Sequence, residues 1–166
     1  MARTPYREAI GASMHAVLQA AFPEMIGERA IVRNPMNEIG TDDPMPCLRC
    51  HDGEHSNAGM DVLGMQTYRL SWTVEGAVEA PNTGDDGTLD TQVNALHARI
   101  IEAIVTTGSL ISIPLVDCWL EIDAVDTEFG LFRIGVRDSE RAGIVFTQAF
   151  SLTVEVPRGT AFVDLA

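Results

Sequence analysis

The sequence predicts an α+β domain: a mainly antiparallel (mixed) sheet of about four to six strands, with two amphipathic helices packed on one face. The first supporting observation is a long strand pattern over 66–80, where apolar and polar residues alternate with a period of two. The second is the helical spacing of apolar residues over 88–106. The third is the element order, helix, strands, helix, strands, which is typical of this class.

The strand over 66–80 is expected to be the centre of the domain. Its predicted core face carries Tyr68, Leu70, Trp72, Val74 and Val78, with Gly76 in an apolar position. Its other face carries Arg69, Ser71, Thr73, Glu75 and Glu79. The strand is about twice as long as the usual ~5 to 6 residues. The helix over 88–106 supplies a cover, because its apolar residues form one stripe: Leu89, Val93, Leu96, Ile100, Ile101 and Ile104.

The N-terminal third predicts a second helix, a short strand and a loop. Thr4 and Pro5 are a typical helix start, and Pro23 stops the helix after about residue 21. The buried stripe of this helix is Ile10, Met14, Val17, Leu18 and Ala21. A short strand over 30–33 ends at Asn34-Pro35. We expect 34–46 to be an exposed, mobile loop, because it is rich in proline and polar residues.

The second half returns to strands. Val116, Cys118, Leu120 and Ile122 alternate with polar residues, so Cys118 is interpreted as a core residue. A short strand is predicted over 131–136, a charged turn over 137–143, and a strong strand over 144–156 with Gln148 on its apolar side. Residues 1–157 therefore form one predicted domain. The tail, 158–166, has no periodicity and is expected to be disordered or an arm that docks on a neighbouring subunit.

Composition limits the partners. With 166 residues, 46% of them hydrophobic, the chain can bury one core. The net charge of -13 opposes tight binding to nucleic acid or to an anionic membrane. Three cysteines give no obvious disulfide framework, which favours a reducing compartment. The N-terminal residues contain no apolar segment typical of a signal peptide, so we expect synthesis in the cytosol.

The segment Cys47-Leu-Arg-Cys50-His51 matches the pattern for covalent attachment of a c-type haem. With His55 added, the same residues could also be zinc ligands, although the usual spacer between ligand pairs is absent. The third interpretation is a strand entered after Pro46, in which the cysteines behave as small hydrophobic residues and Gly53 ends the element. We favour the strand and predict no cofactor.

No catalytic arrangement is recognisable, and we predict that the chain is not an enzyme. His15 and His97 fall on helices beside polar neighbours and are interpreted as solvated. The serines lack the glycine-flanked turn that exposes a nucleophile. Asp85 and Asp86 lack the spacing of a calcium loop, and carboxylates at this position stabilise the start of the following helix.

The order of these elements resembles the small tail terminator (tail completion) proteins of long-tailed bacteriophages and phage-like particles. The resemblance is one of pattern and covers most of the chain. It is carried by a helix of the Arg7-Glu8-Ala9-Ile10 type, a strand ending near Val32-Arg33, a proline-anchored strand ending in Asp52-Gly53-Glu54, the long strand 68–80, the helix containing Leu96-His97-Ala98-Arg99-Ile100-Ile101, and the last strand 150–156. Cys47 and Cys50 depart from the aliphatic residues expected there, which leaves the cofactor interpretation open.

The resemblance implies a structural role without catalysis or cofactor. Such proteins form a hexameric ring on the finished tail tube, stop its polymerisation and present a surface to the head-side connector or stopper protein. The expected place is the virion tail near the head–tail junction, reached by assembly in the host cytoplasm. Phage DNA would pass through without specific binding, because an acidic ring lowers adhesion of a polyanion, and no membrane is involved.

The expected interaction surfaces follow from this ring. The loops 34–46 and 80–87 should lie at axial or luminal surfaces, and the polar face of the central strand is a further candidate for subunit contact. The named residues are Asp42, Asp43, Asp85, Asp86, Arg69, Thr73 and Glu75. The alternatives are another neck or head–tail joining protein, or a small haem- or zinc-binding module using Cys47, Cys50, His51 and His55.

Overall fold

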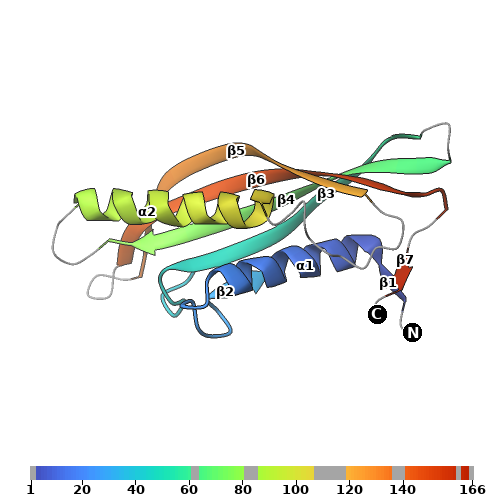
Figure 1. Ribbon diagram of the computed structural model, residues 1–166. Coiled ribbons are helices and arrows are strands. Elements are labelled where there is room, and N and C mark those ends of the chain that lie inside the picture. Colours follow the sequence, from blue (N-terminus) through green and yellow to red (C-terminus); the bar gives the residue numbers. More distant parts are fainter. Residues whose placement is uncertain are drawn as a thin grey trace.

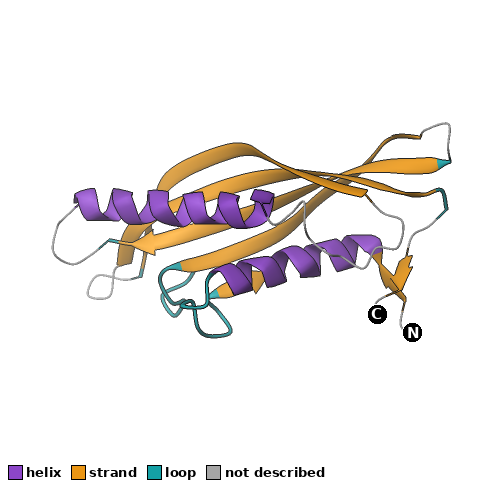
Figure 2. Ribbon diagram, viewed as in Figure 1, coloured by secondary structure: helices purple, strands orange, loops and turns teal. Residues whose placement is uncertain are grey.

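The computed structural model describes residues 3–60, 64–80, 86–106, 119–135, 141–159 and 162–164, without the side chains of a few residues next to the gaps and near the termini. A five-stranded mixed sheet has two helices on one face (Figures 1 and 2). In spatial order the strands are β2 (Ile31–Arg33), β3 (Cys47–Met60), β4 (Met65–Glu79), β6 (Arg141–Pro157) and β5 (Trp119–Ile134). The helices are α1 (Tyr6–Ala21) and α2 (Asp86–Ile101), which continues into a π-helical turn, η1 (Glu102–Thr106). The predicted α+β architecture is confirmed.

The central position of β4 and the assignment of its two faces are confirmed. β4 pairs with β3 on one side and with β6 on the other, both antiparallel. Leu70, Trp72, Val74 and Val78 are buried, whereas Arg69 and Ser71 between them are exposed. Among the described strand pairs, β2 and β3 are parallel and the others are antiparallel. The two-residue alternation therefore separates a helix-covered face from an open face.

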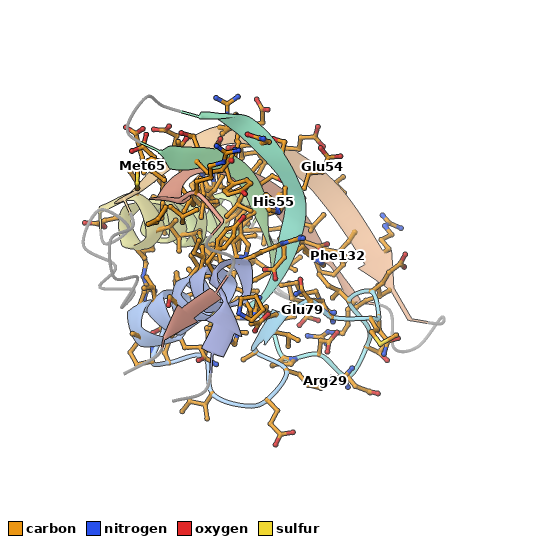
Figure 3. The ribbon with its side chains drawn as sticks, turned by 90° about the vertical axis from the view of Figure 1, so that its right-hand side faces the viewer. Arg29, Glu54, His55, Met65, Glu79 and Phe132 are labelled. Carbon is orange, nitrogen blue, oxygen red and sulfur yellow. The ribbon has the colours of Figure 1, made fainter. Side chains whose placement is uncertain are left out.

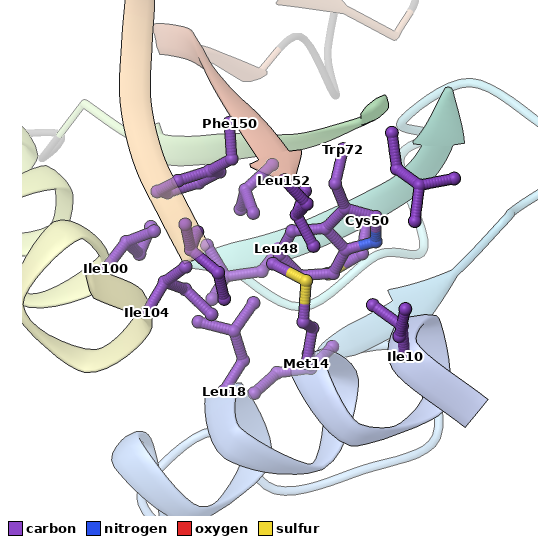
Figure 4. Packing of buried hydrophobic residues seen from close by; sticks show 14 of the residues in the cluster. Ile10, Met14, Leu18, Leu48, Cys50, Trp72, Ile100, Ile104, Phe150 and Leu152 are labelled. Atoms are coloured by element: carbon purple, nitrogen blue, oxygen red, sulfur yellow. The ribbon is translucent and has the colours of Figure 1, made fainter. Parts of the chain in front are cut away.

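The core lies between the sheet and the two helices (Figure 4). Met14 and Leu18 of α1 and Ile100 of α2 are fully buried, as the helical spacing predicted. They pack with Trp72 and Phe150 of the sheet, whose ring centroids are 6.1 Å apart. The described ends of both helices agree with the predicted ends to within a few residues.

Gly76 makes room for the ring of Phe146 on the neighbouring strand β6. It pairs with Phe146 of β6, and a Cβ atom at Gly76 would lie 2.3 Å from the Phe146 ring. A side chain at this position would therefore displace a buried phenylalanine. The packing of Phe146 thus requires a glycine at this position of β4.

Several predicted boundaries are wrong, always because a strand is longer than its polarity suggests. β3 does not end at Gly53 but runs to Met60, with shifts of register after Asp52 and Asn57. The small and polar residues 56–60 are therefore part of the strand, because pairing with the first part of β4 satisfies their backbone. Likewise 131–134 continues β5, and 141–143 of the predicted charged turn begins β6. Cys118 lies outside the described residues.

The first and last described strands pair with each other. β1 (Arg3–Pro5) pairs antiparallel with β7 (Phe162–Asp164), beside the start of α1 (Figure 1). The aperiodic tail gave no indication of this pairing within the chain. Docking of the tail on a neighbouring subunit stays a prediction.

Candidate functional site: the open face and the edges of the sheet

The open face of the sheet is polar and built from small side chains. Thr73 lies opposite Ala149, and Ser71 lies opposite Ser151, on the central strands β4 and β6. On both sides of this centre stand carboxylates that are exposed or half-buried: Glu75, Glu121, Asp123, Glu128 and Glu155. Arg69 is exposed, and Thr73 and Glu75 are half-buried, so the predicted interaction residues of β4 do lie together on one accessible face.

Asp43 is not on the surface as predicted, because it forms a buried ion pair. Its carboxylate lies 2.5 Å from Nη2 of Arg49 and 2.9 Å from Nε of Arg29, and it accepts a hydrogen bond from the Gly40 N–H. The side chains of Asp43 and Arg49 are 0% and 5% exposed. Burial acts to raise the pKa of Asp43, but the Gly40 N–H and the Arg49 guanidinium outweigh it and hold the pKa below its ordinary value.

A third arginine holds the same loop against the sheet. Arg141 at the start of β6 donates to the backbone carbonyls of Thr41 and Asp43, and it forms a bidentate pair with Glu79 at the end of β4. Arg29 and Glu79 lie on the same side of the molecule in the view along the strands (Figure 3). Charge-assisted hydrogen bonds therefore anchor the loop 34–46 at Thr41 and Asp43. Most of the loop is exposed or half-buried, as expected, and its mobility stays a prediction. Sequence reasoning missed this network, because neither the spacing nor the composition pairs residues 6 to about 100 positions apart.

The other loop residues divide. Asp42 is exposed, next to the buried Asp43. Asp86 begins α2, where a carboxylate was expected, and its side chain is not described. Asp85 lies outside the described residues.

The haem and zinc interpretations require side chains that converge, and these residues diverge. Cys50 pairs with Val74 and points into the core, whereas Cys47 lies three residues earlier on the opposite face of the same strand. His51 shares the face of Cys47, and its Nε2 lies 3.8 Å from Glu75. His55 lies on the helix side, beyond the register shift (Figure 3). Among the described residues, no group of three or more His, Cys, Asp or Glu side chains could hold a metal ion.

Both thiols are also protonated at neutral pH. Burial raises the pKa of Cys47 to about 11 and the pKa of Cys50 to about 12. The thiolate is the form that attacks an electrophile or binds a metal. At neutral pH both cysteines therefore behave as the small hydrophobic residues that the strand interpretation proposed.

A charged network ties α1 to the sheet. Arg33 on β2 donates to Glu8 of α1, with Nη1 2.6 Å from Oε1, and to Asp52 of β3, with Nη2 2.5 Å from Oδ2. Trp72 donates its indole N–H to the same Asp52 over 3.1 Å. A Cβ atom at Gly11 would lie 2.4 Å from the Arg33 guanidinium, so this helical glycine makes room for it.

Both helices also place a histidine or tyrosine against the sheet. The Tyr6 hydroxyl lies 2.6 Å from Nε2 of His55, and the two rings meet edge to face. His97 on α2 is half-buried, with Nε2 2.8 Å from Oε1 of the buried Gln148. His15 lies 3.2 Å from the carbonyl of Ile31. The prediction of solvated His15 and His97 is wrong, because each contacts an acceptor that the sheet supplies.

The strand β5 carries exposed apolar side chains that the sequence analysis did not predict. Among the described strands, β5 is the last of the sheet, and its one partner there is β6. Val125, Phe129 and Leu131 on this strand are 55%, 53% and 86% exposed. The sequence carries a signal for this, since acidic residues interrupt the apolar ones along β5 as they do on many edge strands.

Within the described ranges, no helix is long and apolar enough to cross a membrane. Comparison of the sequence with protein-family models and with curated proteins finds no match. The functional argument therefore rests on the surfaces of the chain itself.

Proposed function

We propose that the chain is a structural protein of a phage or phage-like tail: a tail terminator that forms a ring, with six subunits as the expected number. The ring caps the completed tail tube, stops its polymerisation and joins the tail to the head-side connector. Phage DNA passes through it without specific binding. The protein assembles in the host cytoplasm and stays in the virion, near the head–tail junction.

One observation carries this proposal: the long edge strand β5 exposes apolar side chains that the described part of the chain leaves largely uncovered. Val125, Phe129 and Leu131 lie on β5, the outermost strand of the described sheet, which pairs with β6 on its inner side. Exposed apolar groups gathered on an edge favour contact with another protein chain. The resemblance in element order and the net charge of -13 agree with a ring around a passing polyanion.

The experiment is electron microscopy of tail tubes incubated with the purified chain, alongside particles assembled with and without it. We expect a ring at one end of each tube, a narrow distribution of tail lengths when the chain is present, and overgrown tubes when it is absent. A chain that stays monomeric beside tubes and leaves tail length unchanged would rule out the proposal.

The same images separate the terminator from another neck or head–tail joining protein. A terminator contacts the end of the tube before any head is attached. A joining protein leaves tube length unchanged and is found only where a head is present. Labelling the chain in intact particles then gives its position.

A further inference from the structure

Two apolar features lie on opposite sides of α2. The first is a projection formed by Leu131 and Phe129 on β5. Both face the helix side of the sheet, because Leu131 pairs with Ile144 and Phe129 with Phe146, which belong to or pack against the core. Leu131 is 86% exposed. The ring of Phe129 is 53% exposed and packs edge to face against His97 of α2, with ring centroids 5.5 Å apart, whereas Leu131 extends beyond the cover that α2 provides.

The second feature is a groove on the other side of α2, toward α1. It has a volume of about 350 Å³, far above the roughly 15 Å³ that a single water needs. Its apolar lining residues are Met25, Pro46, Val78, Ala95 and Leu96. Glu24, Gln92 and Arg99 also line it, and Glu24 and Arg99 form an ion pair there. Ala95 and Pro46 are exposed there. Figure 1 shows β5 on one side of α2 and α1 on the other.

The register of the sheet places the projection and the groove at the same level along the strands. Leu131 pairs with Ile144, and Ile144 pairs with Val78 in the lining of the groove. Pro46 precedes Cys47, which pairs with Ala77, so Pro46 lies at the level of Val78. One row across the sheet thus contains an exposed leucine on the outer strand β5 and, two strands away on β4, a residue that lines the groove.

We propose that the two features are the halves of a head-to-tail contact between copies of this chain, in which Leu131 and Phe129 of one copy enter the groove of the next. The inference rests on the proposed ring and names the surfaces that close it. A second copy is the favoured occupant because each copy presents both halves at one level, on opposite sides of α2. A rotation axis parallel to the strands preserves that level. Repetition of such a heterologous contact gives a ring when the rotation closes.

The contact is tested by cysteine cross-linking in a Cys118→Ala background, with the buried Cys47 and Cys50 retained. The variants are Leu131→Cys and Ala95→Cys, which place one thiol on the projection and one in the groove. Asp126→Cys is the matched control, since it is exposed on the same strand roughly 17 Å away from position 131. Each protein is oxidised alone and in mixtures, at high concentration and with tail tubes.

A head-to-tail contact predicts covalent dimers when Leu131→Cys and Ala95→Cys are mixed, and none when either is oxidised alone. The double variant should give a ladder that ends at the number of subunits in the ring. Asp126→Cys mixed with Ala95→Cys should give at least tenfold less dimer. These results together would support the proposed contact.

The contradicting results differ for the contact and for the ring. Rings on tubes without the mixed cross-link would overturn the contact and leave the terminator function standing. Dimers of Leu131→Cys alone would show a symmetric contact through β5 instead. Absence of any assembly, even with tubes present, would overturn both the contact and the proposed function.

Discussion

The two faces of the sheet use the same strands for different purposes. On the helix side, β4 places Leu70, Trp72 and Val74 in the core, where they are at most 4% exposed. On the open side, the intervening Ser71 is exposed, and Thr73 is half-buried and opposite Ala149. No described helix covers the open side (Figure 2).

Because of this difference, substitutions on the two faces should affect different properties: stability on the helix side and assembly on the open side. Burial of apolar side chains is the main source of folding free energy, so substitutions on the helix side should change the free energy of unfolding. Substitutions on the open face or at the β5 edge remove little buried surface and should act mainly on contacts with other chains. The following predictions test this division, from the largest expected effect on stability to the smallest.

Trp72→Ala should give the largest loss of stability. The ring is 2% exposed, packs near Phe150, and donates its N–H to Asp52. Removal of a large buried aromatic side chain should lower the free energy of unfolding by ~3 to 5 kcal/mol. Urea denaturation of the variant beside the wild type measures the change. A loss below about 1 kcal/mol would mean that the helices do not cover this part of β4.

Asp43→Ala should give the next largest loss in the free energy of unfolding, although the residue belongs to a loop on the open side. It leaves the buried Arg49 guanidinium without its carboxylate partner, and breaking a buried ion pair in this way costs about 3 kcal/mol. The neighbouring Asp42→Ala is the matched control, because Asp42 is exposed and should change stability by less than ~0.5 kcal/mol. Equal effects of the two variants would contradict the docked position of the loop.

Low pH should destabilise the fold, because it protonates carboxylates that are paired with arginine. Burial tends to raise the pKa of Asp52, but hydrogen bonds from Arg33 and Asn34 outweigh it, so the pKa lies below its ordinary value, and Asp43 behaves likewise. A carboxyl with a lowered folded-state pKa contributes stability above the unfolded-state value of about 4. That contribution disappears as the pH falls through the folded-state pKa. Melting temperatures from pH 6 down to pH 2.5 should fall, and Asp52→Asn should flatten the slope.

Thr73→Ala should cost under ~1 kcal/mol, since its half-buried side chain is on the open face. This is the direct counterpart of Trp72→Ala, one residue away on the same strand. If the open face also contacts another chain, Thr73→Asp should keep the monomer folded and reduce ring formation. Urea melts combined with tail-length measurements separate the two effects.

The sequence predicted the fold where burial follows a regular period. The alternation in β4 and the apolar stripes of α1 and α2 each depend on neighbours within a few residues, and all three are present. It failed where the determining partner is remote. The second half of β3 is polar, with His55, Ser56 and Asn57, and it is a strand only because β4 pairs with it.

The candidate surfaces were less predictable for the same reason. Adjacent Asp42 and Asp43 are equivalent in the sequence, but Arg49 and Arg29 select Asp43 for burial. Leu131 has the same character as a core residue, and its exposure depends on β5 being the last strand of the sheet. Strand order and long-range ion pairs are tertiary properties that local patterns do not specify.

The division between stability and assembly is tested most directly by Leu131→Asp. Because Leu131 is 86% exposed, the variant should match the wild type within ~0.5 kcal/mol in urea denaturation. The decisive measurement is the mass distribution of assemblies that wild type, Thr73→Ala and Leu131→Asp form with tail tubes. We expect rings from the wild type and from Thr73→Ala, and monomers from Leu131→Asp. Rings from Leu131→Asp in the normal amount would show that the exposed edge of β5 does not carry assembly.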